Sequence, residues 1–509
     1  MGMCSEHCAT LPTVTQIFES LNEQGIRYCH WKSNAALGRS LEGLTDLDLL
    51  VDRRHGERFR LMLHQYDVKP IVSSPDKQYP GVEDYLGFDP DTGRLFHLHV
   101  HYQLVLGEQF VKNYRLPLEE AFLDNVRTYG GLVKVPSPEL EVTVLAIRAL
   151  LKYRDRDVVK DMLSIRTPGL PSHMRNEFEY LLGQTSLESI SSTLQTQAGL
   201  VPAGIVLEFL NTLGRSARSG YTCYRLRRDL RRALSVYQRH SRWWAVRQYF
   251  RALMQRRFSF VRQLAGVPAW TKKVLAGGGT VVAVIGADGA GKSTVVRTLC
   301  KWLSWKLEVR HYYMGSQERS PLAQLLHVGA RLARKIHRLW SGRVGESRGS
   351  SRALRWLARF LYSLYQLSIA RNRFRFFKAA RRQAAQGAIV ICDRYPLAAI
   401  HQVMEGAPMD GPRIAVEAGG AMDRLTGRLA RLEQQIYRQI HPPDHVFVLH
   451  VSPEVSQRRK PEHDRGMIEA KSRALREMDS QGLHVTDIDA DQPFEQVVLE
   501  VKKSLWQLL

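Results

Sequence analysis

The residues that most clearly suggest a chemical function form one glycine-rich segment, Gly286-Ala287-Asp288-Gly289-Ala290-Gly291-Lys292-Ser293, which Thr294 follows. Glycines in such a segment let backbone N–H groups converge on phosphate oxygens. The lysine can then reach the phosphoryl group that is transferred, and the hydroxyl can bind Mg²⁺. The segment therefore predicts an ATP site with Ser293 as a metal ligand, and its binding residues are Gly286, Asp288, Gly289, Ala290, Gly291, Lys292, Ser293 and Thr294.

A carboxylate and a guanidinium follow a second apolar run. Residues 388–392 have the composition of a strand, and Asp393, Arg394 and Tyr395 come directly after it. Ligands of open parallel sheets bind at the carboxyl ends of the strands. We therefore expect Asp393 to hold Mg²⁺, directly or through water, and Arg394 to bind the acceptor. The alternative interpretation is a polar turn at the end of a strand.

A pair of arginines, Arg458 and Arg459, follows the apolar run 445–450 and the dipeptide Ser452-Pro453. Arginines on a segment that closes over ATP stabilise the charge of the group in transfer. The alternative is a helix face that is exposed to solvent.

Five short apolar runs alternate with helical patterns in this half of the chain, at residues 280–285, 308–313, 388–392, 445–450 and 484–488. Alternation of this kind predicts parallel strands with helices on both faces, which is a three-layer α/β fold. The glycine-rich segment lies between the first run and an amphipathic helix. Its backbone is therefore placed at the strand-to-helix turn that phosphate binding requires.

Residues 278–509 resemble thymidylate kinase and its relatives. The sequence GADGAGKST is similar to the family's GxDGxGKST, and Asp393-Arg394-Tyr395 matches its DRY/DRF motif. The segments PPDHVFVLHVSPEVSQRR and DIDADQPFEQVVLEV resemble later parts of the family. The resemblance implies a P-loop kinase that uses ATP and Mg²⁺, with Asp288 near the sugar of the acceptor. The implied catalytic residues are Lys292, Asp393, Arg394, Asp288 and the lid arginines Arg458 and Arg459.

The acceptor does not follow from this resemblance. Thymidylate kinases place an arginine and a Pro-Gly-Gly turn after the second strand to seat the monophosphate, whereas this chain has His311-Tyr312-Tyr313-Met314-Gly315-Ser316. Similar divergent kinases are associated with surface-polysaccharide pathways. A nucleoside monophosphate and a sugar or glycan therefore both remain candidate acceptors.

The N-terminal part resembles the nucleotidyltransferase fold of polymerase β-like and aminoglycoside-modifying enzymes, at residues 28–34 and 43–51. Asp46 and Asp48 are alternate residues of a predicted strand, so both carboxylates can hold a metal ion that carries a nucleotide's phosphates. A third acid is expected on a neighbouring strand, but the candidate strand carries His97, His99 and His101. An active transferase, a domain that only binds a nucleotide or sugar, and a structural remnant remain open, and the histidines are alternative metal ligands.

The net charge of +23 is concentrated in two segments. Residues 215–262 contain 14 Lys or Arg against one acid, and residues 331–382 contain 15 against one. Aromatic and leucine residues between the arginines are typical of a helix on an anionic membrane surface. The alternatives are a site for acceptor phosphates and packing between domains. No nucleic-acid module accompanies the charge, which disfavours nucleic acid as a partner.

Composition and pattern together predict four regions: a nucleotidyltransferase-like domain at 1–135, a helical domain at 136–213, a basic connector at 214–277 and a kinase domain at 278–509. The absence of a signal-like N-terminus predicts a cytoplasmic protein, with the inner face of the membrane as a second location. The oligomeric state is not predicted. Two rival functions remain: a nucleotidyltransferase whose kinase-like half only binds nucleotide, and a membrane-associated assembly protein that uses ATP as a structural ligand.

Overall fold

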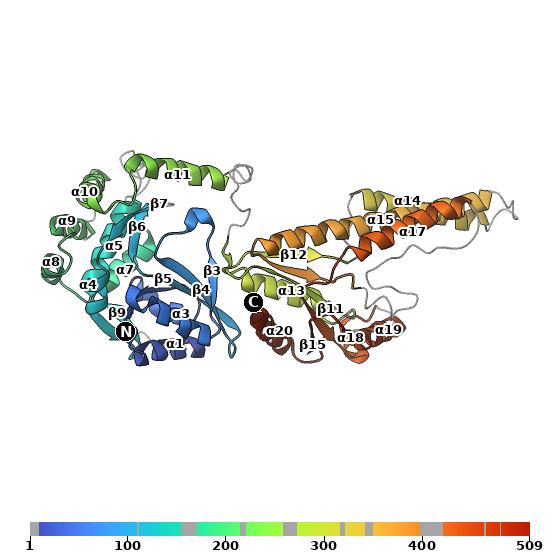
Figure 1. The fold of residues 1–509 in the computed structure, drawn as a ribbon, viewed down its shortest axis with the longest axis horizontal. Coiled ribbons are helices and arrows are strands. Elements are labelled where there is room, and N and C mark those ends of the chain that lie inside the picture. The colour runs from blue at the N-terminus through green and yellow to red at the C-terminus, as the bar shows by residue number, and fades with distance from the viewer. Residues whose placement is uncertain are drawn as a thin grey trace. The chain divides into compact units, whose positions relative to one another are not determined.

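The computed structural model describes residues 10–108, 111–153, 170–213, 220–257, 272–315, 321–341, 350–397, 421–462, 465–478 and 480–509. The chain divides into two compact units, Met1–Ala276 and Gly277–Leu509 (Figure 1). Parts of the two basic segments, at 215–219, 258–262 and 342–349, and Ser316, the last residue of the segment 311–316, lie outside the described residues.

The described part of the N-terminal unit contains a mixed sheet with strand order β1-β2-β5-β4-β3-β10. Only β2 and β5 pair in parallel within it. Two hairpins, β6-β7 and β8-β9, accompany the sheet. The elements are α1 (Pro12–Glu23), β1 (Tyr28–His30), α2 (Leu37–Leu41), β2 (Leu47–Val51), α3 (Gly56–Gln65), β3 (Lys69–Val72), β4 (Val82–Asp89), β5 (Arg94–His101), β6 (Leu104–Glu108), β7 (Val111–Leu116), α4 (Glu119–Asp124), β8 (Val126–Tyr129), β9 (Val133–Pro136) and β10 (Val274–Leu275).

The two faces of this sheet have different chemistry because successive side chains of a strand point to opposite sides. Leu49 of β2 and Leu98 and Val100 of β5 pack in one core with apolar residues of α1 and α3. The residues between them, which include Asp48 and His99, therefore belong to the opposite face. The alternation thus separates an apolar face from one that carries titratable groups.

A helical part follows the sheet in sequence. Ser137 caps its first helix by accepting a hydrogen bond from the N–H of Leu140 at 3.5 Å. This helix, α5, is buried on nearly all sides, as expected for a helix whose residues are mostly apolar. The elements are α5 (Pro138–Lys152), α7 (Ser172–Leu182), α8 (Leu187–Thr196), α9 (Ala203–Leu213), α10 (Gly220–Ala233) and α11 (Arg242–Arg257).

The C-terminal unit confirms the predicted α/β fold with a parallel sheet. The strand order is β12-β13-β11-β14-β15, and every pair is parallel. The strands lie within one residue of the predicted runs at both ends. The elements are β11 (Thr280–Gly286), α13 (Lys292–Leu303), β12 (Val309–Tyr313), α14 (Pro321–Ser341), α15 (Ser350–Ala385), β13 (Ile389–Asp393), α17 (Ala421–Arg438), β14 (His445–His450), α18 (Pro453–Arg459), α19 (Arg465–Arg476), β15 (Val485–Asp489) and α20 (Phe494–Leu508).

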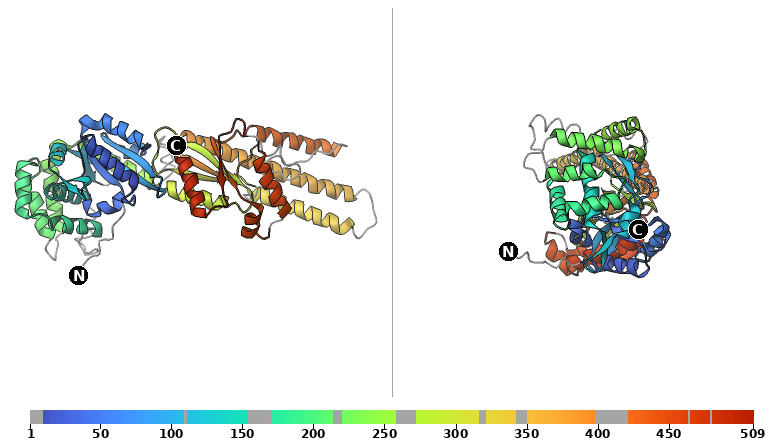
Figure 2. Two further views of the ribbon diagram at one scale, coloured as in Figure 1. Left: turned by 90° about the horizontal axis from the view of Figure 1, so that it is seen from below. Right: turned by 90° about the vertical axis from the view of Figure 1, so that its left-hand side faces the viewer.

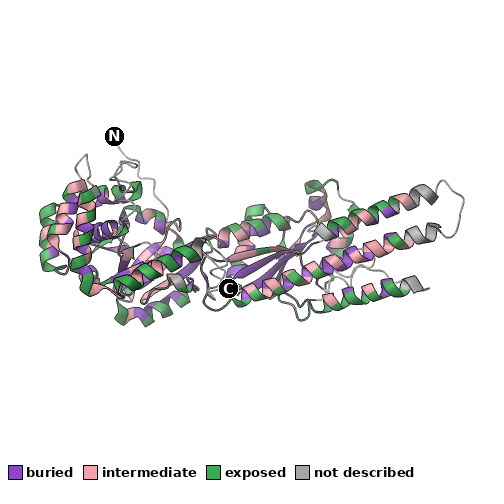
Figure 3. Ribbon diagram, turned by 90° about the horizontal axis from the view of Figure 1, so that it is seen from above, coloured by how far each residue is buried: buried purple, intermediate pink, exposed green. Residues whose placement is uncertain are grey.

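Helices cover both faces of the parallel sheet, with α13 and α20 on one side and α15 on the other (Figure 1). The three central strands, β13, β11 and β14, are almost entirely buried, whereas the edge strands β12 and β15 are partly exposed (Figure 3). Helix α15 packs against α14 and α17, and these three helices extend beyond the sheet within this unit (Figure 2). None of the described helices combines the length with the hydropathy that a membrane span requires.

Candidate functional site

The glycine-rich loop joins β11, which ends at Gly286, to α13, which begins at Lys292. Gly289 and Gly291 have φ values of +84° and +83°, which side chains of L-residues rarely tolerate. A Cβ on Gly289 would also lie 2.8 Å from Oγ of Ser456. The path of the loop therefore depends on these two glycines, and the loop leads directly to the N–H groups of the first turn of α13.

Lys292 is folded into its own loop. Its Nζ donates hydrogen bonds to the carbonyl oxygens of Gly286 at 2.9 Å and Ala287 at 2.7 Å, and the side chain is buried. Burial, together with the nearby charge of Arg394, lowers the pKa of Lys292 to about 8. The loop thus holds a cation at its centre, and an anion bound beside it would stabilise the charged form of Lys292.

Ser293 and Asp393 meet although 100 residues separate them in sequence. Parallel pairing places Val284 of β11 beside Asp393 at the end of β13. The Ser293 hydroxyl donates to Oδ2 of Asp393 at 2.6 Å. The other oxygen of Asp393, Oδ1, is buried and has no hydrogen-bond partner within the part of the chain that the structure describes. These oxygens form the kind of donor set that a hard divalent cation prefers.

Asp288 of the loop lies between two cations. Arg394 donates to its Oδ1 at 3.2 Å, and the ammonium of Lys471 on α19 contacts its Oδ2. Burial opposes the negative charge of Asp288, but Lys471, Lys292 and Arg394 outweigh that effect and lower its pKa to about 2. Arg394 has a φ of +68°, which is costly for a residue with a side chain. The residue with this unfavourable backbone conformation is thus also the one whose guanidinium contacts the loop.

Helix α18 packs against the same loop. The Ser456 hydroxyl donates to the carbonyl oxygen of Asp288, and Arg459 donates to the carbonyl oxygens of Gly289 at 3.4 Å and Ala490 at 3.1 Å. Arg458, the other predicted lid residue, is exposed. Both arginines therefore lie at the surface, and Arg459 also contacts the loop.

Most of the residues that the sequence singled out in this half of the chain come together at one edge of the sheet. Lys292, Ser293, Asp393, Asp288 and Arg394 lie there, with Ser293 bound to Asp393 and Arg394 bound to Asp288, and Arg459 contacts the same loop. The sequence reasoning missed Lys471 and Ser456. Neither belongs to a recognisable motif, so only the packing of α18 and α19 on the loop reveals them.

The predicted metal residues of the N-terminal unit have separate partners. Oδ1 of Asp48 binds the Lys32 ammonium at 2.7 Å, and Oδ1 of Asp46 lies 2.9 Å from Nδ1 of His97. A third carboxylate does lie nearby on the same sheet, at Asp84 of β4. The register aligns it with His99, which in turn aligns with Asp48. The sequence reasoning missed Asp84, because Asp84 belongs to β4, which lies next to β5 and is not a neighbour of β2.

The C-terminal unit is thus an α/β domain in which a glycine-rich loop and a strand-end carboxylate share one edge of a parallel sheet. No model of a known protein family matches the chain. The chain is similar to two proteins of Escherichia coli strain K12. One, named "Uncharacterized ATP-binding protein YghR", is 28% identical over 230 residues, which are 44% of this chain and 86% of the relative. The other, "Uncharacterized ATP-binding protein YghS", is 26% identical over 227 residues, which are 43% of this chain and 89% of the relative.

Proposed function

We propose that the C-terminal unit is an ATP-dependent phosphotransferase of the P-loop kinase type. The observation that carries the proposal is the Ser293–Asp393 hydrogen bond of 2.6 Å beside the buried ammonium of Lys292. A hydroxyl, a carboxylate and a lysine in this arrangement suit a magnesium-bound polyphosphate. The names of the two relatives as ATP-binding proteins support the nucleotide part of the proposal.

Each residue has a defined task in this proposal. Backbone N–H groups of the loop and of the first turn of α13 bind the phosphates of ATP. Lys292 exchanges its hydrogen bonds to the carbonyl oxygens of Gly286 and Ala287 for a contact with a phosphate oxygen. Its positive charge then has a negatively charged partner. Ser293 and Asp393 hold Mg²⁺, which neutralises charge on the phosphoryl group when bound. Arg394 and Arg459 add positive charge at the same edge.

The acceptor belongs beside Asp288. This carboxylate stays ionised because Lys471 and Arg394 hold it, so it can accept a hydrogen bond from an acceptor hydroxyl. An oxygen of the acceptor attacks the γ-phosphorus of ATP, the bond between that phosphorus and the bridging oxygen breaks, ADP leaves, and the proton of an attacking hydroxyl passes to solvent. We propose a nucleoside monophosphate or a sugar or glycan as the acceptor.

The test is incubation of the purified full chain with γ-labelled ATP, Mg²⁺ and a panel of nucleoside monophosphates, sugars and lipid-linked glycans. Label that moves to one acceptor class, and is lost when Mg²⁺ is chelated, supports the proposal. ATP binding without transfer to any acceptor would instead favour the rival functions, in which this half only binds nucleotide.

Thymidine monophosphate is expected to be a poor acceptor. The arginine of β12, Arg310, binds Glu308 at 2.7 Å near the start of the strand, and the strand ends in Tyr313, where a monophosphate would need a cation. Loss of one charge-assisted contact corresponds to roughly a 10- to 100-fold lower rate. Initial rates with thymidine monophosphate and with the best acceptor of the panel measure the difference. Equal rates would show that another group seats the phosphate.

We also infer that the protein associates with the inner, anionic face of a membrane. A row of exposed apolar residues at helical spacing runs along α11, among exposed arginines, and Trp243 and Phe250 are 84% and 57% exposed. Helix α14 carries a second exposed apolar row. The two rows are Trp243, Val246, Phe250 and Leu253 on α11, and Leu325, Val328 and Leu332 on α14.

Binding to anionic liposomes is expected at low salt and should weaken as salt rises. Each arginine near such a surface contributes about 1 kcal/mol, and salt screens this attraction. Inserted aromatic side chains would leave a salt-resistant remainder. The double variant Trp243→Ser, Phe250→Ser should lose that remainder in liposome sedimentation over a salt series.

The matched control is Leu61→Ser, because Leu61 is 61% exposed on α3, outside both basic segments. It should bind as the parent protein does. Equal sedimentation with neutral and anionic liposomes would contradict the inference. The arginines would then bind the acceptor or take part in protein contacts.

A further inference from the structure

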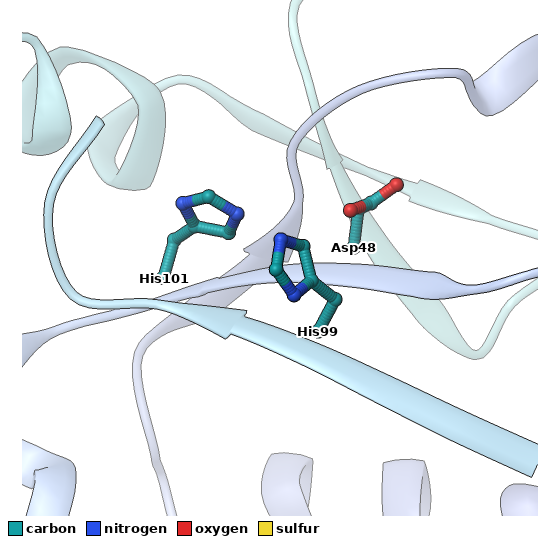
Figure 4. Close-up of side chains that lie close together, drawn as sticks. All are labelled: Asp48, His99 and His101. Carbon is teal, nitrogen blue, oxygen red and sulfur yellow. The ribbon is translucent and has the colours of Figure 1, made fainter. Parts of the chain in front are cut away.

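Three side chains on one face of the N-terminal sheet converge. Asp48 of β2 lies opposite His99 of β5 in the parallel register, and His101 follows on the same face of β5. One ligand atom from each of the three lies within 4.8 Å of the other two. Figure 4 shows the three side chains rising from the two neighbouring strands toward a common space.

His101 is the member of this group whose polar atoms most need a partner. Its side chain is fully buried, and neither Nδ1 nor Nε2 has a hydrogen-bond partner in the described ranges of the chain. A buried polar group without a partner costs free energy and calls for an explanation. Its ring stands edge-on to that of His99, with the ring centroids 4.6 Å apart. A shared metal ion would satisfy both rings.

His99 is held in the orientation that a metal ligand needs. Its Nδ1 lies 2.7 Å from Oδ1 of Asp84, which leaves Nε2 as the nitrogen for a metal. Asp84 is fixed in turn by Lys273 at 2.5 Å and by Nε2 of His97 at 3.1 Å. A carboxylate behind a ligating histidine is the usual outer partner of metal sites, because it fixes the ring and raises its basicity.

The donor set selects the class of ion. Two imidazoles and one carboxylate suit zinc and other divalent transition metals, whereas magnesium prefers oxygen ligands. Bond lengths of a tetrahedral site put ligand atoms roughly 3.3 Å apart, so ligand atoms that lie within 4.8 Å of one another must approach by up to about 1.5 Å. This set differs from the pair Asp46 and Asp48 that the sequence predicted, because Asp46 lies against His97.

We propose that Asp48, His99 and His101 bind one divalent transition-metal ion of the zinc class. Three protein ligands leave at least one coordination position for water or an anionic group. The site is independent of phosphoryl transfer in the C-terminal unit. Lys32, whose ammonium contacts Oδ1 of Asp48 at 2.7 Å, is the competing cation, so metal and ammonium exclude one another at that carboxylate.

The test uses the full chain, stripped of metal by chelation, and titration with Co²⁺ followed by its visible absorption, then displacement by Zn²⁺. The N-terminal Cys4 and Cys8 are replaced by serine in all samples, so that these thiols do not contribute. Asp48→Asn and His101→Gln are expected to remove the bound-cobalt spectrum. Asp84→Asn should weaken metal binding by about 10- to 100-fold, as outer-partner changes do.

Two further variants keep the test decisive. His64→Gln is the matched control, because His64 is an exposed histidine of α3, which packs on the opposite, apolar face of the sheet, and it should retain the cobalt spectrum. Lys32→Met removes the competing ammonium and should tighten binding by roughly tenfold. That gain does not depend on whether the ligand variants fold, which circular dichroism checks separately.

The proposal is overturned if the parent protein gives no bound-cobalt spectrum, or if folded Asp48→Asn and His101→Gln bind cobalt as the parent does. Equal loss in His64→Gln would also overturn this ligand set. Unchanged or weaker binding in Lys32→Met would contradict the competition between the two cations.

Discussion

Replacement of Lys292 by alanine is expected to lower phosphoryl transfer from ATP by about 100- to 1,000-fold, the usual effect of removing one preorganised charge from a transition state. Lys292 is the cation at the centre of the loop, and its partners there are the carbonyl oxygens of Gly286 and Ala287. Its ammonium can stabilise the charge that develops on the transferring phosphoryl group. Turnover with γ-labelled ATP and the best acceptor measures the loss.

Because Lys292 is buried, its removal could also affect the loop itself. Lys292→Met keeps most of the aliphatic volume, so this variant should remain folded by circular dichroism and be as inactive as the alanine variant. Lys301→Ala is the matched control, since Lys301 lies in the same helix but is exposed, and its activity should be unchanged. Normal turnover in a folded Lys292→Met protein would refute the kinase proposal.

The second large effect is expected for Asp393→Asn, which should lower turnover at saturating ATP and Mg²⁺ by about 100-fold. The amide oxygen of asparagine can still accept the hydrogen bond from Ser293, so the local structure should persist. The negative charge that would hold Mg²⁺ is lost. ATP affinity, measured by calorimetry, should therefore fall by less than turnover, and the Mg²⁺ requirement should rise.

Asp487→Asn is the matched control for Asp393→Asn, because Asp487 is an exposed acid on β15 of the same sheet that binds His450. It removes one negative charge without touching the loop, so turnover and the Mg²⁺ requirement should not change. If Asp393→Asn weakened ATP binding but kept full turnover at saturation, Asp393 would bind the nucleotide without taking part in the reaction.

The local elements of the C-terminal unit could be predicted because their signals are local. The run at 445–450 is apolar and β-branched and forms β14 over the same residues, and the loop reads as phosphate-binding from its own glycines and lysine. Backbone preference and the burial pattern act over a few residues, so short stretches of sequence are enough to predict them. The α/β class and the parallel sheet followed from the alternation of these stretches.

Such local signals do not predict the contacts between site residues that lie far apart in the sequence. The Ser293–Asp393 hydrogen bond exists because β13 pairs with β11, and Lys471 reaches Asp288 because α19 packs against β14 and places that side chain at the loop. Residues a hundred or more positions apart are brought within hydrogen-bond distance by strand order and helix packing, which depend on the free energy of the whole core.

The same division holds in the N-terminal unit. The sequence by itself determined that Asp46 and Asp48 share one face of their strand and that His97, His99 and His101 share one face of theirs, because the side-chain period of a strand is two. The resemblance already implied that the strand with these histidines is a neighbour of the strand with Asp48, and the pairing of β2 with β5 confirms it. Only the tertiary structure decided the register of that pair and that β4 lies beyond β5, which aligns Asp48, His99 and Asp84 in one row. Register between strands is fixed by the burial of the opposite, apolar face against α1 and α3, and no single strand encodes it.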